Sequence, residues 1–305
     1  MKTRAPDITS VASVVHRLAV LMAAGVPSVT AWGYLESGAM TIRIAKRKGI
    51  GIPDAIVEES EALALATDMS TTEVRAWRGV AAAWSVATDA GAPLAPTLRH
   101  FAQSLRDVAQ AQRDIAVALA APVATARLVI GLPPVGILFG MVLGFNTLGT
   151  LFTTPLGWAC LAIGSSLLVG ARAWNRSLVR SAQPRNLTPG LEFDLTAIAV
   201  SGGSALDRAR ASVNSALTRF GIESRDGDGV AVVLDLSRRA GVPAAELLRS
   251  EAEERRRSAL ADSQQQAQAL GIRLMVPLGV CVLPAFMILA VVPLFVTVVS
   301  STSIG

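Results

Sequence analysis

The chain has 305 residues, of which 51% are hydrophobic, and a formal net charge of +5 from 28 basic and 23 acidic side chains. This mixture is too apolar for an ordinary soluble protein, so it predicts a membrane part and a separate water-facing part. The basic residues are nearly all arginines that alternate with acids instead of clustering with aromatic residues, which argues against nucleic acid as a partner.

The chain begins with a charged segment, about residues 1–122, in which apolar residues recur at helical spacing. Leu98, Phe101 and Leu105 fall on one such stripe, and the alternation typical of strands is scarce. We therefore predict an all-helical, water-facing first segment.

Two stretches of the chain contain no Asp, Glu, Lys or Arg: residues 128–171 and residues 274–305. A helix needs about 20 apolar residues to cross the hydrocarbon core of a bilayer. The first stretch is long enough for two passes and the second for one. We therefore predict a transmembrane hairpin over about 123–172 and a final transmembrane helix over about 271–299.

The distribution of arginine predicts the orientation of these spans. Four arginines follow the second span closely, whereas the turn between the first two spans, residues 146–154, has no charge; the arginines are Arg172, Arg176, Arg180 and Arg185. Basic residues are enriched on the cytoplasmic side of membrane proteins. Residues 173–270 are thus predicted to form a second cytoplasmic helical segment, and residues 300–305 a short extracytoplasmic tail.

One kind of turn occurs three times in the water-facing segments. Each copy has Gly followed two residues later by Pro, at residues 24–27, 90–93 and 240–243. Glycine adopts the left-handed conformation that ends a helix, and proline suits the start of the next. A fourth variant, at residues 201–204, has Ser204 where a helix N-cap is expected.

These turns indicate an internal repeat. A shift of 150 positions pairs Val80 with Val230, Gly91 with Gly241, Pro93 with Pro243, Leu98 with Leu248, Arg99 with Arg249, Arg106 with Arg256 and Pro134 with Pro284. Upstream, a shift of 177 pairs Leu18 with Leu195 and Gly25 with Gly202, so the first copy carries about 27 extra residues within 38–70. The prediction is an all-α membrane protein with two repeated cytoplasmic helical-bundle domains and three transmembrane helices.

Glycines and prolines mark the predicted spans. Gly136, Gly140 and Gly144 recur every four residues, a spacing that lets a second helix approach closely in a membrane, although glycine is also tolerated in lipid without a partner. Prolines are expected to kink the first and last spans: Pro133, Pro134, Pro277, Pro284 and Pro293.

No pattern of catalytic, cofactor-binding or metal-ligating residues emerges. The sequence has no GxxxxGK[ST] loop, and His16 and His100 stand outside any HExxH context. Cys160 and Cys281 fall inside predicted spans and are interpreted as small packing residues. We therefore predict a protein that is not an enzyme and has no cofactor.

The long helices expected after Pro93 and Pro243 carry the candidate partner-binding residues. These are Arg99, Arg106, Arg249 and Arg256, which repeat between the two copies, together with Glu251 and Glu253. The simpler interpretation of the charged run is a solvated helix face with i,i+4 pairs, Glu251 with Arg255 and Glu253 with Arg257.

Two helical domains, each running directly into a span, resemble the type II secretion system F domain family. The likeness is to the TadB/TadC-like platform proteins of Flp (Tad) pilus assembly, and the hairpin residues 153–158 followed by the Arg/Trp-rich exit at 172–176 contribute to it. The resemblance covers about residues 10–299. The chain departs from many relatives in lacking a span before the first domain.

The resemblance implies a non-enzymatic platform protein in the bacterial inner membrane. Its implied partners are a cytoplasmic secretion ATPase, pilin-like subunits, the lipid bilayer, and a second platform protein or a further copy of itself. Two other functions stay open: a membrane scaffold or signalling protein, and a small-solute permease subunit. The near absence of polar groups in the predicted spans disfavours the permease.

Overall fold

The computed structural model describes residues 8–35, 38–66, 69–142, 149, 152, 154–181, 189–223, 227–293 and 295. Every element among these residues is helical and none is a strand, so the predicted all-α class is confirmed. The chain forms two compact units. The first combines Met1–Gln112 with Arg185–Leu260, and the second combines Arg113–Pro184 with Ala261–Gly305.

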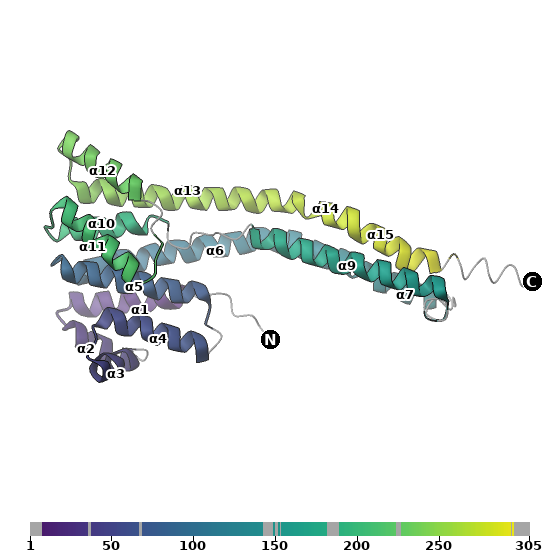
Figure 1. Ribbon diagram of the computed structural model, residues 1–305, viewed down its shortest axis with the longest axis horizontal. Helices are drawn as coiled ribbons and strands as arrows, with labels where there is room; N and C mark the ends of the chain where they lie inside the picture. Colours follow the sequence, from purple (N-terminus) through teal and green to yellow (C-terminus); the bar gives the residue numbers. More distant parts are fainter. Residues whose placement is uncertain are drawn as a thin grey trace, which may run out of the picture. The chain divides into compact units, whose positions relative to one another are not determined.

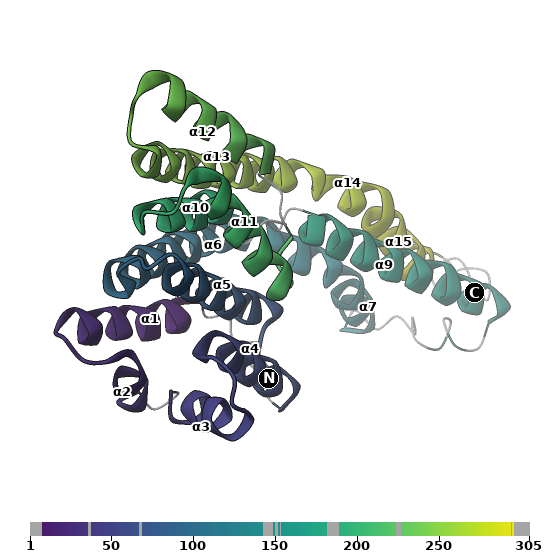
Figure 2. The same ribbon diagram turned by 60° about the vertical axis from the view of Figure 1, so that its left-hand side comes forward.

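The first unit therefore contains most of both predicted water-facing segments (Figures 1 and 2). Its helices are α1 (Ile8–Ala23), α2 (Ser28–Gly33), α3 (Gly38–Lys48), α4 (Ile52–Ala66), α5 (Thr71–Asp89), α10 (Leu191–Ser201), α11 (Leu206–Arg219), α12 (Gly227–Ala240) and the first parts of α6 (Leu94–Ile130) and α13 (Ala244–Arg273). The helices α3 and α4 fall in the region of the extra residues that the sequence places in the first half.

Helix α10 lies in the middle of this unit and is buried nearly all round. One side joins a large apolar core with α1, α5, α6 and α11, through residues such as Leu195. The opposite side, with Phe193 and Ala197, packs against Val230 and Leu248 of α12 and α13. A helix with apolar residues on every side is stable only in such a position, between other helices.

The interhelical turns use glycine as the sequence predicts. Gly25, Gly91 and Gly241 have φ values of +90°, +68° and +67°. In the fourth turn the left-handed glycine is Gly203, at φ +87°, one residue beyond Gly202, which the shift of 177 pairs with Gly25. The N-cap prediction for Ser204 is wrong, because α11 begins at Leu206 and Ala205 stands at its N-cap.

Gly202 allows close approach between the two halves of the first unit, which are Met1–Gln112 (the first half) and Arg185–Leu260 (the second half). A Cβ on Gly202 would meet the carbonyl oxygen of Ala90 and would lie 2.9 Å from that residue's carbonyl carbon and Cβ. The end of α10 therefore touches the backbone at the end of α5.

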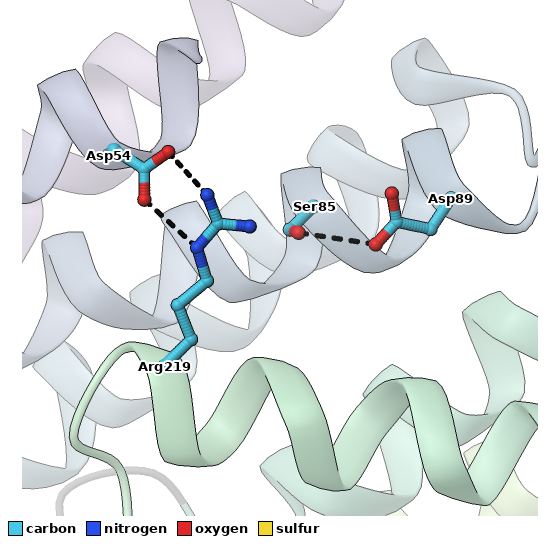
Figure 3. A network of polar contacts seen from close by, with 4 residues as sticks. All are labelled: Asp54, Ser85, Asp89 and Arg219. Carbon is cyan, nitrogen blue, oxygen red and sulfur yellow. Dashed lines mark hydrogen bonds and ion pairs between the residues drawn. The ribbon is translucent and has the colours of Figure 1, made fainter. Parts of the chain in front are cut away.

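A bidentate ion pair also connects the halves, between α4 and α11 (Figure 3). Arg219 donates from Nε to Asp54 Oδ1 at 3.0 Å and from Nη2 to Oδ2 at 2.6 Å. The side chain of Arg219 is 55% exposed and that of Asp54 is 27% exposed. Water and salt thus screen the pair, and its contribution to stability is small.

We expect a double-mutant cycle with Arg219→Ala and Asp54→Ala to give a coupling energy of about 1 kcal/mol or less, the range of exposed pairs. The coupling is expected to shrink in 1 M salt. Urea unfolding of the four proteins at low and high salt measures both quantities. A coupling above about 2 kcal/mol would show that the pair is less screened than its exposure indicates.

The second unit is built from the apolar parts of the chain. It contains α7 (Leu132–Val142), α9 (Pro155–Ser181), α14 (Met275–Pro277), α15 (Leu283–Phe286), the π-helical segments η1 (Leu278–Val282) and η2 (Met287–Val291), and the remaining parts of α6 and α13. Within it, α9 packs against η1, α15 and η2, and α7 packs against α15 and η2.

Two helices of the described chain are long and apolar enough to cross a membrane. They are Pro155–Leu178, with 24 residues, and Ala244–Leu289, with 46 residues, whose apolar part is its second half. They correspond to the predicted second and third spans.

The predicted first span is not one continuous helix. Helix α6 ends at Ile130, Gly131 lies in a turn, and α7 starts at Leu132. Pro133 and Pro134 have no N–H to donate to the preceding turn, which explains a break at this point. The first of the three predicted spans therefore stays a prediction.

Candidate functional site

A polar pocket lies within the first unit, between the start of α6, the middle of α10 and the first half of α13. Its volume is about 240 Å³. Its polar lining residues are Thr97, His100, Ser104, Asp194, Ser201, Arg249, Glu253 and Arg256, and its apolar lining comes from Ala92, Pro93, Pro96, Phe101 and Ile198.

The turns before α6 and α13 place these side chains. The left-handed Gly91 and Gly241 end the preceding helices, and each long helix starts three residues later. On α6, His100 and Ser104 are one turn apart, and on α13, Arg249, Glu253 and Arg256 follow the same spacing, so each set lies on one helix face.

An ion pair between Asp194 and Arg256 forms the inner wall of the pocket. Arg256 Nη1 donates to Asp194 Oδ2 at 2.7 Å; the Arg256 side chain is 14% exposed and the Asp194 side chain is 19% exposed. Burial raises the pKa of Asp194, while Arg256, Ser104 and His100 act in the opposite direction. The carboxylate is therefore held in a poorly solvated position by a nearby cation and hydrogen bonds.

The outer part of the pocket is more exposed. Arg249 Nη2 donates to Ser201 Oγ at 3.2 Å, and the Ser201 hydroxyl donates to the carbonyl of Ala197. Glu253, also at this rim, pairs with Arg257 at 3.4 Å. Arg249 and Glu253 thus offer one positive and one negative group near the mouth of the pocket.

The structure brings together some of the predicted partner-binding residues and not others. Arg249, Arg256 and Glu253 line the pocket, whereas Arg99, Arg106 and Glu251 do not. Glu251 instead accepts from Arg255 at 3.0 Å, so both predicted i,i+4 pairs on α13 are confirmed. Arg99 is exposed and Arg106 is half-buried on α6.

Sequence reasoning missed Asp194, Ser104 and His100 as members of the site. A signal existed for Asp194, since a carboxylate in a mostly apolar helix, here together with Glu192, needs a partner when it is buried. The identity of the partner depends on the packing of α10 against α13, which residue spacing does not give.

The arrangement, a buried ion pair below a rim that carries Arg249 and Glu253, suits the recognition of a polar or charged group. In the part of the chain that the structure describes, no group of three or more His, Cys, Asp or Glu residues could hold a metal ion.

A second, smaller cavity of about 40 Å³ lies among α2, α3, α4 and α5. Glu59 lines it and accepts a hydrogen bond from the Thr41 hydroxyl. Burial raises the pKa of Glu59, and the Thr41 hydrogen bond and Arg43 act in the opposite direction. The ring of Trp32 also lines the cavity, and its buried Nε1 has no partner among the described residues.

The raised pKa of Glu59 predicts a pH dependence of stability. A carboxyl whose pKa is higher when folded binds its proton more tightly in the folded state, so its contribution is largest below the unfolded value near 4.5 and is lost as the pH rises through the folded pKa. Glu59→Gln is therefore expected to gain stability relative to the wild type as the pH rises from about 4 to about 8.

Urea unfolding across this pH range checks the expectation. Thr41→Ala serves as a control of opposite sign, because it removes a group that lowers the pKa of Glu59. Its loss of stability is expected to grow with pH. A constant stability difference between Glu59→Gln and the wild type at all pH values would contradict the raised pKa.

The candidate membrane-packing glycines lie partly within the second unit. Gly136 and Gly140 are on α7, and Gly144 is outside the described residues. Among the glycines of this unit whose surroundings the structure describes, Gly164 of α9 stands in close contact with a neighbouring helix: a Cβ there would lie 2.7 Å from Leu289 Cδ2. Sequence spacing could have singled out Gly164, because Gly157, Gly164 and Ala171 recur every seven residues and all three are buried; the prediction considered only the glycines of the first span.

Comparison of the chain with protein-family models, with curated proteins and with solved structures gives no match.

Proposed function

We propose that this chain is a non-enzymatic platform protein of a type II secretion or Tad pilus assembly machine. In this role it resides in the bacterial inner membrane as a multi-pass protein with its first unit in the cytoplasm. It couples a cytoplasmic secretion ATPase to the extraction of pilin-like subunits from the bilayer and to filament assembly. The proposal includes three spans and a duplicated cytoplasmic domain.

The observation that carries the proposal is the continuity of α13. Helix α13 starts in the charged first unit at Ala244 and ends at Arg273. The next residue, Leu274, lies in a turn but still donates its N–H to the Leu270 carbonyl at 2.9 Å, so helical structure continues to Leu289. The whole 46-residue stretch is apolar in its second half. A continuous helix transmits displacement at one end to the other better than a flexible linker does. A platform that is moved by an external ATPase needs this kind of connection.

The apolar part of this helix also contains two segments with a wider helical turn. The segments η1 and η2 are π-helical, and Pro277 precedes the first while Pro293 follows the second. π-helical segments inside α-helices are frequent at functional sites, because a widened turn leaves backbone groups free to rearrange. In the proposed role, these segments let the helix deform locally where a pilin-like subunit passes along it.

The duplicated domain is supported by the backbone of the turns. Gly91 and Gly241 have nearly equal φ values, and Pro27 and Ala205 share φ −57° and ψ 144°. This second pair corresponds to a shift of 178, one more than the sequence alignment gives.

The polar pocket is the proposed contact point for the ATPase, with Arg249 as the exposed residue at its rim. Arg256 is unsuitable for testing this contact, because its pairing with Asp194 means that a charge reversal would also destabilise the fold. Arg249→Glu is the cleaner variant. Arg208→Glu, at an exposed position of α11, is the matched charge-reversal control.

The test is affinity capture of the tagged full-length protein from its native membrane, with mass spectrometry of the captured proteins. We expect a secretion-type ATPase and pilin-like proteins, with the ATPase reduced at least about tenfold by Arg249→Glu, equivalent to about 1.4 kcal/mol, and unaffected by Arg208→Glu. Normal filament assembly and export in a deletion strain would refute the proposed function. Capture of a sensor kinase or a solute-binding protein instead would favour the scaffold, signalling or permease alternatives.

A further inference from the structure

One row of side chains on α5 forms the interface with the second half of the first unit. Arg78, Ala82, Val86 and Ala90 follow one another at i,i+4 spacing and therefore share a face. Ala90 is contacted by Gly202, and the Arg78 guanidinium lies 3.4 Å from the Cβ position of Gly221. Ala82 and Val86, between these two contacts, are both fully buried at 0% exposure.

Helix α12 carries the corresponding row of side chains, but on α12 the two central residues of the row are exposed to solvent. A shift of 150 leads from the α5 row to Asp228, Val232, Leu236 and Ala240. Val232 is 66% exposed and Leu236 is 48% exposed, whereas the corresponding Ala82 and Val86 are buried. α12 lies at the edge of the unit away from α2 and α3 in both views (Figures 1 and 2).

Burial on the inner side of each helix, away from the row just described, also supports the correspondence between α5 and α12. Val80 and Val230 are 0% and 2% exposed, so the two helices turn the same position toward their own half. The outer face of α12 is therefore the place where a following helix pair would pack, as α10 and α11 pack on α5.

The first half contains a helix pair of this kind, α1 and α2. Gly25 corresponds to Gly203 in the turn, with φ +90° and +87°. The first-half pair also has two exposed apolar residues beside this turn, Val20 at 47% and Val29 at 49%. With the shift of 178, Val20 takes the position of Ile198, which is only 9% exposed in the second half.

We infer that the outer face of α12 in one copy packs against α1 and α2 of a second copy of this chain, head to tail. The second copy extends the packing that already joins the halves within one chain. Helices α1 and α2 of the second copy cover Val232 and Leu236, and the turn between these two helices has the same glycine conformation as the turn between α10 and α11. The inference rests on the duplicated domain that is part of the proposed function, but not on the proposed ATPase and pilin partners, so failure to capture those partners would leave it standing.

The interchain contact cannot be identical to the one within the chain. Ala24 takes the place of Gly202 and adds the Cβ that Gly202 lacks, so the two backbones must be farther apart at that turn. This difference makes the interchain contact looser than the intrachain one. Because the contact is heterologous, repeated application builds a ring if the rotation closes and a filament if it does not.

Site-specific cross-linking of the full-length protein in nanodiscs or detergent tests the arrangement. In a background with Cys160→Ala and Cys281→Ala, one preparation carries Val232→Cys and another carries Val20→Cys. A short bis-maleimide is expected to give a cross-linked dimer when the two are mixed and little when either is treated alone. Cross-linking of Val232→Cys with itself would replace the head-to-tail arrangement with a symmetric one and overturn the inference.

A disruption experiment complements the cross-linking. The double variant Val232→Glu/Leu236→Glu is expected to weaken self-association at least about tenfold in sedimentation or single-molecule photobleaching. Leu65→Glu, at a position that is 93% exposed on α4, is the control and is expected to leave association unchanged. Unchanged unfolding by urea in each variant separates lost association from lost folding. A wild-type protein that is monomeric in nanodiscs, or a double variant that associates normally, would refute the inference.

Discussion

Replacing Gly202 by alanine is expected to destabilise the first unit by about 3 kcal/mol, the upper part of the range for overpacking. The new Cβ would meet the backbone of Ala90, and backbone atoms on both sides cannot rotate away as a flexible side chain does. The end of α10 would have to move from the end of α5. Because this contact joins the two halves, the loss is expected to affect the cooperativity of unfolding as well as its free energy.

The neighbouring glycine is the matched control. Gly203 has φ +87° and open space around its Cβ position, so Gly203→Ala suffers only the cost of a left-handed non-glycine residue, about 1–2 kcal/mol. A smaller effect for Gly202→Ala than for Gly203→Ala would show that the approach of α10 to α5 is not tight.

Tryptophan fluorescence during urea unfolding measures both variants in the full-length protein. Trp32, Trp77 and Trp84 lie in the first unit, and Trp158 and Trp174 lie in the second. Replacing the last two by phenylalanine leaves reporters only in the unit that the substitutions perturb.

Truncation of Arg256 is expected to have the other large effect. Arg256→Ala leaves the buried carboxylate of Asp194 without its cation, which costs about 3 kcal/mol for a buried pair. The residue next to it on the chain is the control. Arg257 is 74% exposed and paired only at the surface, so Arg257→Ala is expected to change stability by about 0.5 kcal/mol or less.

A double variant separates the value of the pair from the cost of a lone buried charge. Asp194→Leu/Arg256→Met replaces both partners by apolar side chains of similar size, and we expect it to recover most of the stability that Arg256→Ala loses. The same urea titration gives the result. A double variant as unstable as Arg256→Ala would mean that the hydrogen bonds of Asp194, including that from Ser104, matter more than its charge.

Much of the local structure was predictable because it depends on short-range chemistry. The left-handed glycines at residues 25, 91 and 241 and the pairs of Glu251 and Glu253 with Arg255 and Arg257 are set by residues no more than four positions apart. The candidate site was predicted only in part. Arg249 and Arg256 were identified by their repetition, but the pairing of Arg256 with Asp194 joins residues 62 positions apart in the chain.

The helical class, the separation of charged from apolar parts, and the turn positions follow from composition and periodicity, because these act locally. That both charged segments share one unit with α10 at its centre depends on contacts between residues far apart in the chain. Such contacts also determine which helix faces are covered. Val86 and Leu236 are apolar residues at corresponding positions, so the residue pattern predicts burial of both. Val86 is buried on α5, against which α10 and α11 pack, whereas Leu236 on α12 is exposed.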